Sequence, residues 1–151
     1  MADLLTHYVT SRVAGVGVRD RANGLLFSLG VFLPDLIGKP IAQLPEVPDL
    51  AAVPSHSLLG LAFACAAVSF LFARDLRARA FAALYAGSVL HVLVDMMKDY
   101  FGRGAVCLLH PFSTTGWEVG LYRSEDVFHL LPINLAILII LWVVGIRRRR
   151  E

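Results

Sequence analysis

The stretch Val127–Ile146 constrains the fold of this chain more than any other feature. It runs for twenty residues with only His129 and Asn134 as strongly polar interruptions. A helix of about 20 apolar residues crosses a hydrocarbon core of about 30 Å. Because lipid offers no partner to a free backbone N–H or C=O, a segment of this kind is expected to be a transmembrane helix.

Three more segments are predicted to be spans, and one shorter segment is predicted to be a helix that is amphipathic or only partly inserted. The predicted spans are Gly24–Ile37, Ser57–Ala73 and Ala80–Met97. The first carries Pro34-Asp35 near its end, and the second is uncharged. The short N-terminal helix is Asp3–Val18, which contains Arg12. The composition agrees with this prediction. Hydrophobic residues make up 57% of the chain, against about 45–50% in soluble domains, and charged residues make up 17%, against about 25%. The mean hydropathy is +0.66. We therefore predict an all-α integral membrane bundle of about four spans plus a short N-terminal helix, formed by residues 1–151 as a single membrane-embedded domain.

The distribution of basic residues predicts the orientation. Nine of the 14 Lys and Arg residues form three clusters: Arg19 and Arg21, then Arg74, Arg77 and Arg79, then Arg147–Arg150. Basic loops stay cytoplasmic, and threading the spans in and out places all three clusters on one side. We expect a bacterial inner-membrane protein with residues 147–151 as a basic cytoplasmic tail. The net charge of +2 is too small to suggest a nucleic-acid partner.

Two connections then lie on the opposite side, which is the periplasmic side of an inner membrane. The segment Gly38–Ser55 contains four prolines and is predicted to be irregular. The segment Gly102–Asp126 is rich in glycine and is predicted to be a loop, with room for short strands. Ser55 is a plausible N-cap for the helix that follows it.

The side chains with metal-ligand chemistry gather on that same side. His91 and Asp95 are four residues apart and project from one face of a helix, where an imidazole nitrogen and a carboxylate oxygen can bind one zinc ion. Asp35 and His56 are expected at the same depth, and a buried carboxylate such as Asp95 costs a few kcal/mol without a partner. A hydrogen-bonded pair that joins two helices is the alternative explanation of the His91–Asp95 spacing.

The other polar residues give weaker predictions. His7 is about as plausible as an interfacial side chain as it is as a ligand. His110 and His129 are expected to be bystanders, although the sequence leaves open whether they join the site.

Several of these motifs resemble a known family. The segments L-T-H7, L-P-D35-L, P-S-H56-S-L-L, H91-V-L-V-D95 and the later Leu-His-Pro-Phe-Ser at 109–113 are similar, in order and spacing, to the YdjM-like bacterial membrane-bound metal-dependent hydrolases. The similarity covers nearly the whole chain. It implies a helical inner-membrane protein with a metal-hydrolase site.

A more distant similarity is to zinc-dependent phospholipase C. It implies that Asp35, His56, His91 and Asp95 hold one zinc ion and that Asp95 bridges to a second metal that touches His7. The chain departs from that pattern, since it has no tryptophan at position 1 and no later HxxxE, and His110 stands where the YdjM-like pattern often has an aromatic residue. One or two metals are therefore expected, rather than three.

These observations predict a metal-dependent hydrolase at the outer face of the inner membrane, acting on a lipid or lipid-linked phosphoester. Its cofactor would be a divalent metal, with zinc favoured. The predicted metal ligands are His7, Asp35, His56, His91 and Asp95, and the predicted catalytic residues are Asp35 and Asp95, of which the carboxylate that is less tightly bound serves as general base. The alternatives are a non-catalytic metal-binding protein, an ion- or proton-handling protein, and an interaction subunit whose histidines only pack helices.

Overall fold

The computed structural model describes residues 4–15, 20–42, 54–99, 106–123 and 126–148. In this part of the chain the structure has five helices and no strand, which confirms the all-α prediction. The helices are α1 (Leu4–Ala14), α2 (Arg21–Ala42), α3 (Leu58–Ser69), α4 (Arg77–Met96) and α5 (Val127–Arg148). Two isolated β-bridges involve residues 106–123. One joins Tyr122 to Lys98, just after α4, and the other joins Val106 to Trp117 within the segment.

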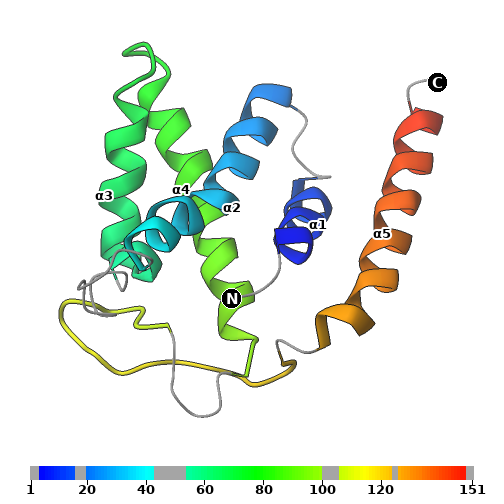
Figure 1. Cartoon of the computed structure of the whole chain (residues 1–151). Coiled ribbons are helices and arrows are strands. Elements are labelled where there is room, and N and C mark those ends of the chain that lie inside the picture. The colour runs from blue at the N-terminus through cyan, green and yellow to red at the C-terminus, as the bar shows by residue number, and fades with distance from the viewer. Residues whose placement is uncertain (1–3, 16–19, 43–53, 100–105, 124–125, 149–151) are drawn as a thin grey trace.

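Helix α4 stands at the centre of the bundle. It packs most extensively against α2 and also contacts α3 and α1, whereas α5 packs against α1 and lies at the edge (Figure 1). Within the described residues, α2 and α4 are each long and apolar enough to cross a membrane. Helix α3 is a shorter apolar helix of 12 residues, which rises about 18 Å at about 1.5 Å per residue, so the number of spans stays a prediction. Helix α5 has a shorter apolar stretch over His129–Val144.

Helices α2 and α4 cross at two glycines. A Cβ atom on Gly30 would collide with the carbonyl oxygen of Leu84, and one on Gly87 would collide with the carbonyl oxygen of Phe27. Small residues of this kind let the backbones of membrane helices approach closely. The contact fixes how far α4 lies from α2, and with it the depth of the side chains that both helices carry.

The helix α2 continues past the point where the sequence predicts its end. Pro34 and Pro40 lie inside it, so the prediction that Gly24–Ile37 is the helical part and that an irregular segment starts at Gly38 is wrong for residues 38–42. Pro34 has no N–H to donate to the carbonyl oxygen of Gly30 four residues earlier. Ser88 of α4 supplies that donor, since its hydroxyl donates to the Gly30 oxygen at 2.9 Å. Residues 43–53 of the predicted irregular segment lie outside the described residues.

The start of α3 also differs from the prediction. The N-cap is Ser57, whose hydroxyl accepts a hydrogen bond from the Gly60 N–H at 3.1 Å. Ser55, the predicted cap, lies in the short 3₁₀ turn before it and bonds to His56 instead. The cap therefore sits two residues later, which leaves His56 outside the helix.

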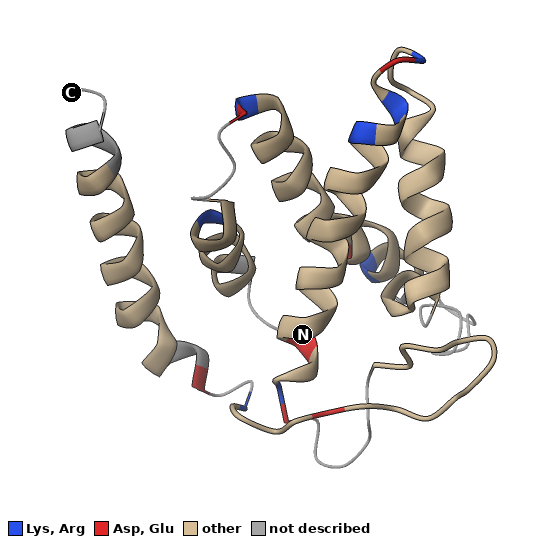
Figure 2. Cartoon of the chain, turned by 180° about the vertical axis from the view of Figure 1, so that it is seen from behind, with Lys and Arg blue, Asp and Glu red and all other residues tan. Residues whose placement is uncertain are grey.

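Arginines of the predicted cytoplasmic clusters gather at one end of the bundle. The α3–α4 turn and the start of α2 lie together there, and their Lys and Arg residues show blue in Figure 2. Arg79 at the start of α4 forms an ion pair with Asp20 and donates to the Asn23 side chain. Helix α3 starts at the other end of the bundle, and helix α4 ends there (Figure 1).

Candidate metal centre

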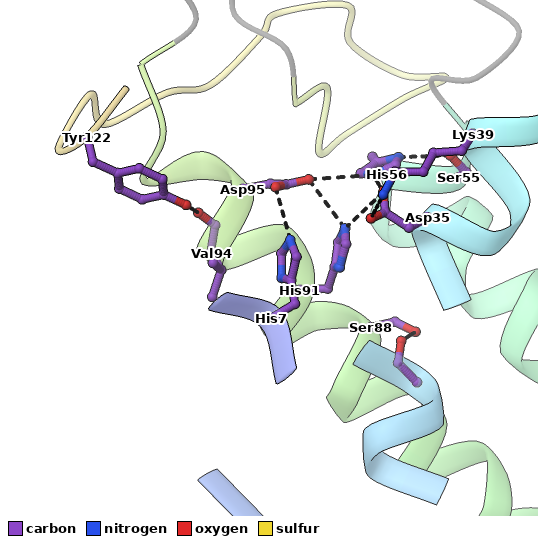
Figure 3. Close-up of polar contacts among 11 residues, drawn as sticks. His7, Asp35, Lys39, Ser55, His56, Ser88, His91, Val94, Asp95 and Tyr122 are labelled. Carbon is purple, nitrogen blue, oxygen red and sulfur yellow. Dashed lines mark hydrogen bonds and ion pairs between the residues drawn. The ribbon is translucent and has the colours of Figure 1, made fainter. Parts of the chain in front are cut away.

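Four elements bring the five predicted ligand residues together at the end of the bundle that lies opposite the arginines. His7 comes from α1, Asp35 from α2, His56 from the turn before α3, and His91 with Asp95 from α4 (Figure 3). His7, Asp35, His91 and Asp95 are each at most 5% exposed, and His56 is half-buried. The close packing of the helices thus joins residues that lie far apart in the sequence.

Asp95 lies at the centre of the cluster. Its Oδ2 atom is 3.3 Å from His91 Nε2 and 3.6 Å from His56 Nε2, and its Oδ1 atom is 3.4 Å from His7 Nε2. One carboxylate therefore faces three imidazoles from three elements. His7 and His91 also stack, with ring centroids 3.9 Å apart and planes 12° apart.

Asp35 faces the same imidazoles from the opposite helix. Its Oδ1 atom lies 3.9 Å from both His56 Nε2 and His91 Nε2, while its Oδ2 atom forms an ion pair with Lys39 one turn later on α2. One oxygen of Asp35 is thus held at the rim, and the other is aimed into the cluster.

His56 is positioned by its neighbours. Its Nδ1 atom is 2.8 Å from the Ser55 hydroxyl, so its Nε2 atom is left to face the two carboxylates. A Cβ atom on Gly38 would collide with the Ser55 hydroxyl and lie 3.2 Å from the His56 ring, so a glycine is needed for this turn to reach α2. Burial lowers the pKa of the His56 imidazole, against the opposing effect of Asp95, and a neutral imidazole is the form that binds metal.

The geometry suits a bound cation better than a set of hydrogen bonds. Hydrogen bonds from N–H to oxygen are about 2.7–3.2 Å long, and the five nitrogen–oxygen separations in the cluster are 3.3–3.9 Å. Two ligands at about 2.0–2.2 Å from a tetrahedral zinc lie about 3.4 Å apart. Two groups in the described part of the chain could hold a metal ion: His7, Asp35 and His91, and His56, His91 and Asp95.

Unpartnered atoms point to the same conclusion. Both ring nitrogens of His7, both ring nitrogens of His91 and the Oδ1 atom of Asp35 are buried and have no hydrogen-bond partner within the described residues. Buried polar groups are almost always satisfied. Five such atoms lie in one cluster, on residues of the groups that could hold a metal ion.

The remaining histidines stand apart from these groups. His110 lies in the segment 106–123, and the exposed His129 begins α5. Neither belongs to a group of described side chains that could share an ion. Sequence reasoning missed Lys39, although it follows Asp35 by four residues, which is the same one-face spacing that singled out His91 and Asp95.

Comparison with known proteins gives one match. The model of a family described as "YdjM inner membrane protein" matches residues 3–150. No curated protein and no solved structure matches the chain.

Proposed function

The chain belongs to the YdjM inner membrane protein family, and we propose that it is a metal-dependent hydrolase that acts on a lipid or lipid-linked phosphoester. The observation that carries this proposal is the cluster of five unpartnered buried atoms, on His7, His91 and Asp35, beside Asp95. Titratable groups of this kind inside a membrane protein are expensive to bury and typically functional.

In this proposal a zinc ion is held by His56, His91 and Asp95. Bound zinc lowers the pKa of a coordinated water from about 15.7 to about 7 and polarises a phosphoryl oxygen. His7 lies 3.4 Å from the other oxygen of Asp95, so His7 and Asp95 would hold the second ion of a two-ion site. The ligand set suits zinc, which binds imidazole and carboxylate alike.

Asp35 is assigned as the general base. Its Oδ1 atom faces the cluster without a hydrogen-bond partner among the described residues, so it can accept a proton from the attacking water. Its Oδ2 atom is held by Lys39, which keeps the carboxylate in one orientation. Asp95 belongs to the catalytic machinery as the carboxylate that would bind the zinc ion together with His56 and His91.

The preference for a phosphoester rests on Lys39. Its side chain is 30% exposed, so the ammonium stands at the rim of the cluster, where it can contact an anionic phosphoryl oxygen. The site lies at the end of the bundle opposite the arginines (Figures 1 and 2). With the basic end cytoplasmic, the C-terminus is cytoplasmic, the chain passes the inner membrane more than once, and the site faces the periplasm.

Metal content and turnover together test this function. We expect the purified protein to contain one or two equivalents of zinc per chain and to release phosphate or a headgroup from at least one phospholipid or lipid diphosphate in a panel. Asp35→Asn should keep the metal and abolish turnover. A protein without stoichiometric metal contradicts the proposal. Metal without turnover on the full panel favours the non-catalytic metal-binding alternative.

A further inference from the structure

The segment 106–123 carries an unusual concentration of exposed apolar side chains next to the site. Its only charged residues are Glu118 and Arg123. Five large apolar residues of this segment are at least half exposed: Leu109, Phe112, Trp117, Val119 and Leu121. The most exposed is Phe112, at 86%. Exposed large apolar side chains gathered on one segment often mark an interaction site.

The exposure is not a consequence of a loose backbone. The Val119 N–H donates to the Met96 carbonyl oxygen and the Leu121 N–H donates to the Met97 carbonyl oxygen, both at 2.7 Å. The Leu58 N–H donates to the Leu108 oxygen at 3.0 Å. These bonds tie the segment to the end of α4 and to the start of α3, so the apolar side chains are held outward.

The same attachments place the segment beside the His/Asp cluster. Leu58 follows His56 by two residues, and Met96 follows Asp95 directly. The hydroxyl of Tyr122 donates to the Val94 carbonyl oxygen at 3.3 Å, one residue before Asp95. Figure 3 shows the contact of Tyr122 with Val94, with part of the segment 106–123 as a yellow trace.

The surface continues onto a helix that could cross the membrane. Leu93 in the last turn of α4 and Met97 just after the helix are 47% and 43% exposed, and the Met97 carbonyl oxygen accepts the hydrogen bond from Leu121. Lipid is the environment that matches an apolar helix face, and Trp117 in the attached segment suits the membrane–water interface, where Trp is enriched. The low charge of the segment argues against exposure to bulk water at this point.

We propose that segment 106–123 inserts into the headgroup–acyl boundary of the leaflet at this end of the bundle and forms the lipid-facing rim of the His/Asp cluster. Because the attachment points flank His56 and Asp95, a lipid substrate would reach the site from the bilayer instead of from water. The second statement rests on the proposed function, whereas insertion of the segment does not depend on it.

Tryptophan fluorescence tests the insertion directly. The chain has two tryptophans, Trp117 and Trp142, so Trp142→Phe leaves Trp117 as the only emitter. We expect strong quenching of Trp117 in vesicles of phosphatidylcholine and phosphatidylglycerol that carry bromines near the headgroup end of the acyl chain. Quenching should be at least twofold weaker with bromines near the chain terminus, and aqueous iodide should quench Trp117 weakly.

A second probe and a control make the test independent of one position. Phe112→Trp in a Trp117→Phe, Trp142→Phe background should show the same depth profile. Trp117→Phe, which leaves Trp142 on the exposed face of α5, reports whether the protein is correctly inserted in the vesicles. If brominated lipids quench Trp142 while iodide alone quenches both loop probes, the insertion proposal is overturned.

The outcome is separable from that of the proposed function. If brominated lipids quench the loop probes in a protein without metal or turnover, the insertion of segment 106–123 is supported and the proposed hydrolase function is contradicted. If the protein turns over substrate but only iodide quenches the loop probes, the hydrolase function is supported and the insertion of segment 106–123 is contradicted.

Discussion

At the scale of single residues, Asp95 and Lys39 define what the site can do. Asp95 presents both carboxylate oxygens to imidazoles, within 3.3–3.6 Å of His7, His56 and His91. Lys39 holds the outer oxygen of Asp35 and keeps its ammonium near the rim. The proposed function gives metal binding and recognition of the substrate's charge to different side chains, so each can be tested by itself.

Removing a ligand should remove the metal. His91→Ala takes away the imidazole common to both candidate groups, and even changes to the groups that hold metal ligands in place typically cost about 10–100-fold in metal affinity. We expect the zinc content, measured by inductively coupled plasma mass spectrometry, to fall below about a tenth of the wild-type value. His129→Ala is the matched control, because His129 is exposed and lies outside both groups; equal zinc in the two variants contradicts the site.

Replacing Lys39 should weaken turnover without removing the metal. A hydrogen bond to a charged group contributes about 1.5–3 kcal/mol, so Lys39→Met should lower kcat/KM for a phosphoester by about tenfold to a hundredfold, at about 1.4 kcal/mol per factor of ten. Lys39→Arg should recover part of that loss because it restores the cation. An unchanged kcat/KM in Lys39→Met, with metal present, argues against a role for Lys39 in binding phosphate.

At the scale of elements, the pair α2 and α4 sets the geometry of the cluster. Gly30 and Gly87 allow the two backbones to meet, and the Ser88 hydroxyl satisfies the carbonyl that Pro34 leaves without a helical donor. Since Asp35 follows Pro34 directly and His91 lies one turn after Gly87, a shift at this crossing changes the separation of the two ligands.

Enlarging Gly30 should therefore destabilise the protein. The Cβ atom of Gly30→Ala would meet the backbone of Leu84, and overpacking costs about 1–3 kcal/mol. Gly24→Ala on the same helix is the control, since nothing lies within 4 Å of its Cβ and alanine favours a helix by about 0.5–1 kcal/mol. Thermal unfolding in detergent should give a lower Tm for Gly30→Ala and an equal or higher Tm for Gly24→Ala; the reverse order contradicts the close crossing.

A double-mutant cycle tests the contact between Ser88 and Gly30. Ser88→Ala should cost about 1 kcal/mol of unfolding free energy, since it removes a buried hydrogen bond. In a Pro34→Ala background the alanine N–H can donate to the Gly30 oxygen, so the cost of Ser88→Ala should shrink. Additive effects of the two substitutions would show that the hydroxyl does not replace the missing helical donor.

At the scale of the whole molecule, the arginine clusters and the His/Asp cluster lie at opposite ends. The α3–α4 turn and the start of α2 carry arginines (Figure 2), while the His/Asp cluster and segment 106–123 lie at the other end of α4 (Figures 1 and 3). Basic segments stay cytoplasmic, so the sidedness of the protein decides from which compartment its site is reached.

Cysteine labelling in intact bacteria tests this sidedness. The natural cysteines are Cys65 and Cys107, and both are replaced by alanine in the background protein. A membrane-impermeant maleimide should label Pro54→Cys, at the exposed start of the turn before α3 and two residues from His56, without lysis. Asp75→Cys, in the exposed α3–α4 turn, should react only after the cells are broken, and the opposite pattern would place the site in the cytoplasm.

The sequence by itself determined the helical class, most helix positions and the identity of the ligand-type residues. Hydrophobic runs locate helices because each backbone group is satisfied within its own segment, and the i, i+4 spacing puts His91 and Asp95 on one face without tertiary information. The sequence misplaced the end of α2, because the proline rule is local and the donor that compensates for Pro34 comes from Ser88, 54 residues later.

Only the tertiary structure decided which residues meet. His7 could not be separated from an interfacial histidine by pattern, and its 3.9 Å stack on His91 depends on how α1 docks against α4. The N-cap moved from Ser55 to Ser57 because the Ser55 hydroxyl bonds to His56, and Lys39 gained a role only when Asp35 was seen to face two histidines. Packing between helices depends on close contacts between distant residues, such as Gly30 with Leu84, and a linear hydrophobic pattern does not specify them.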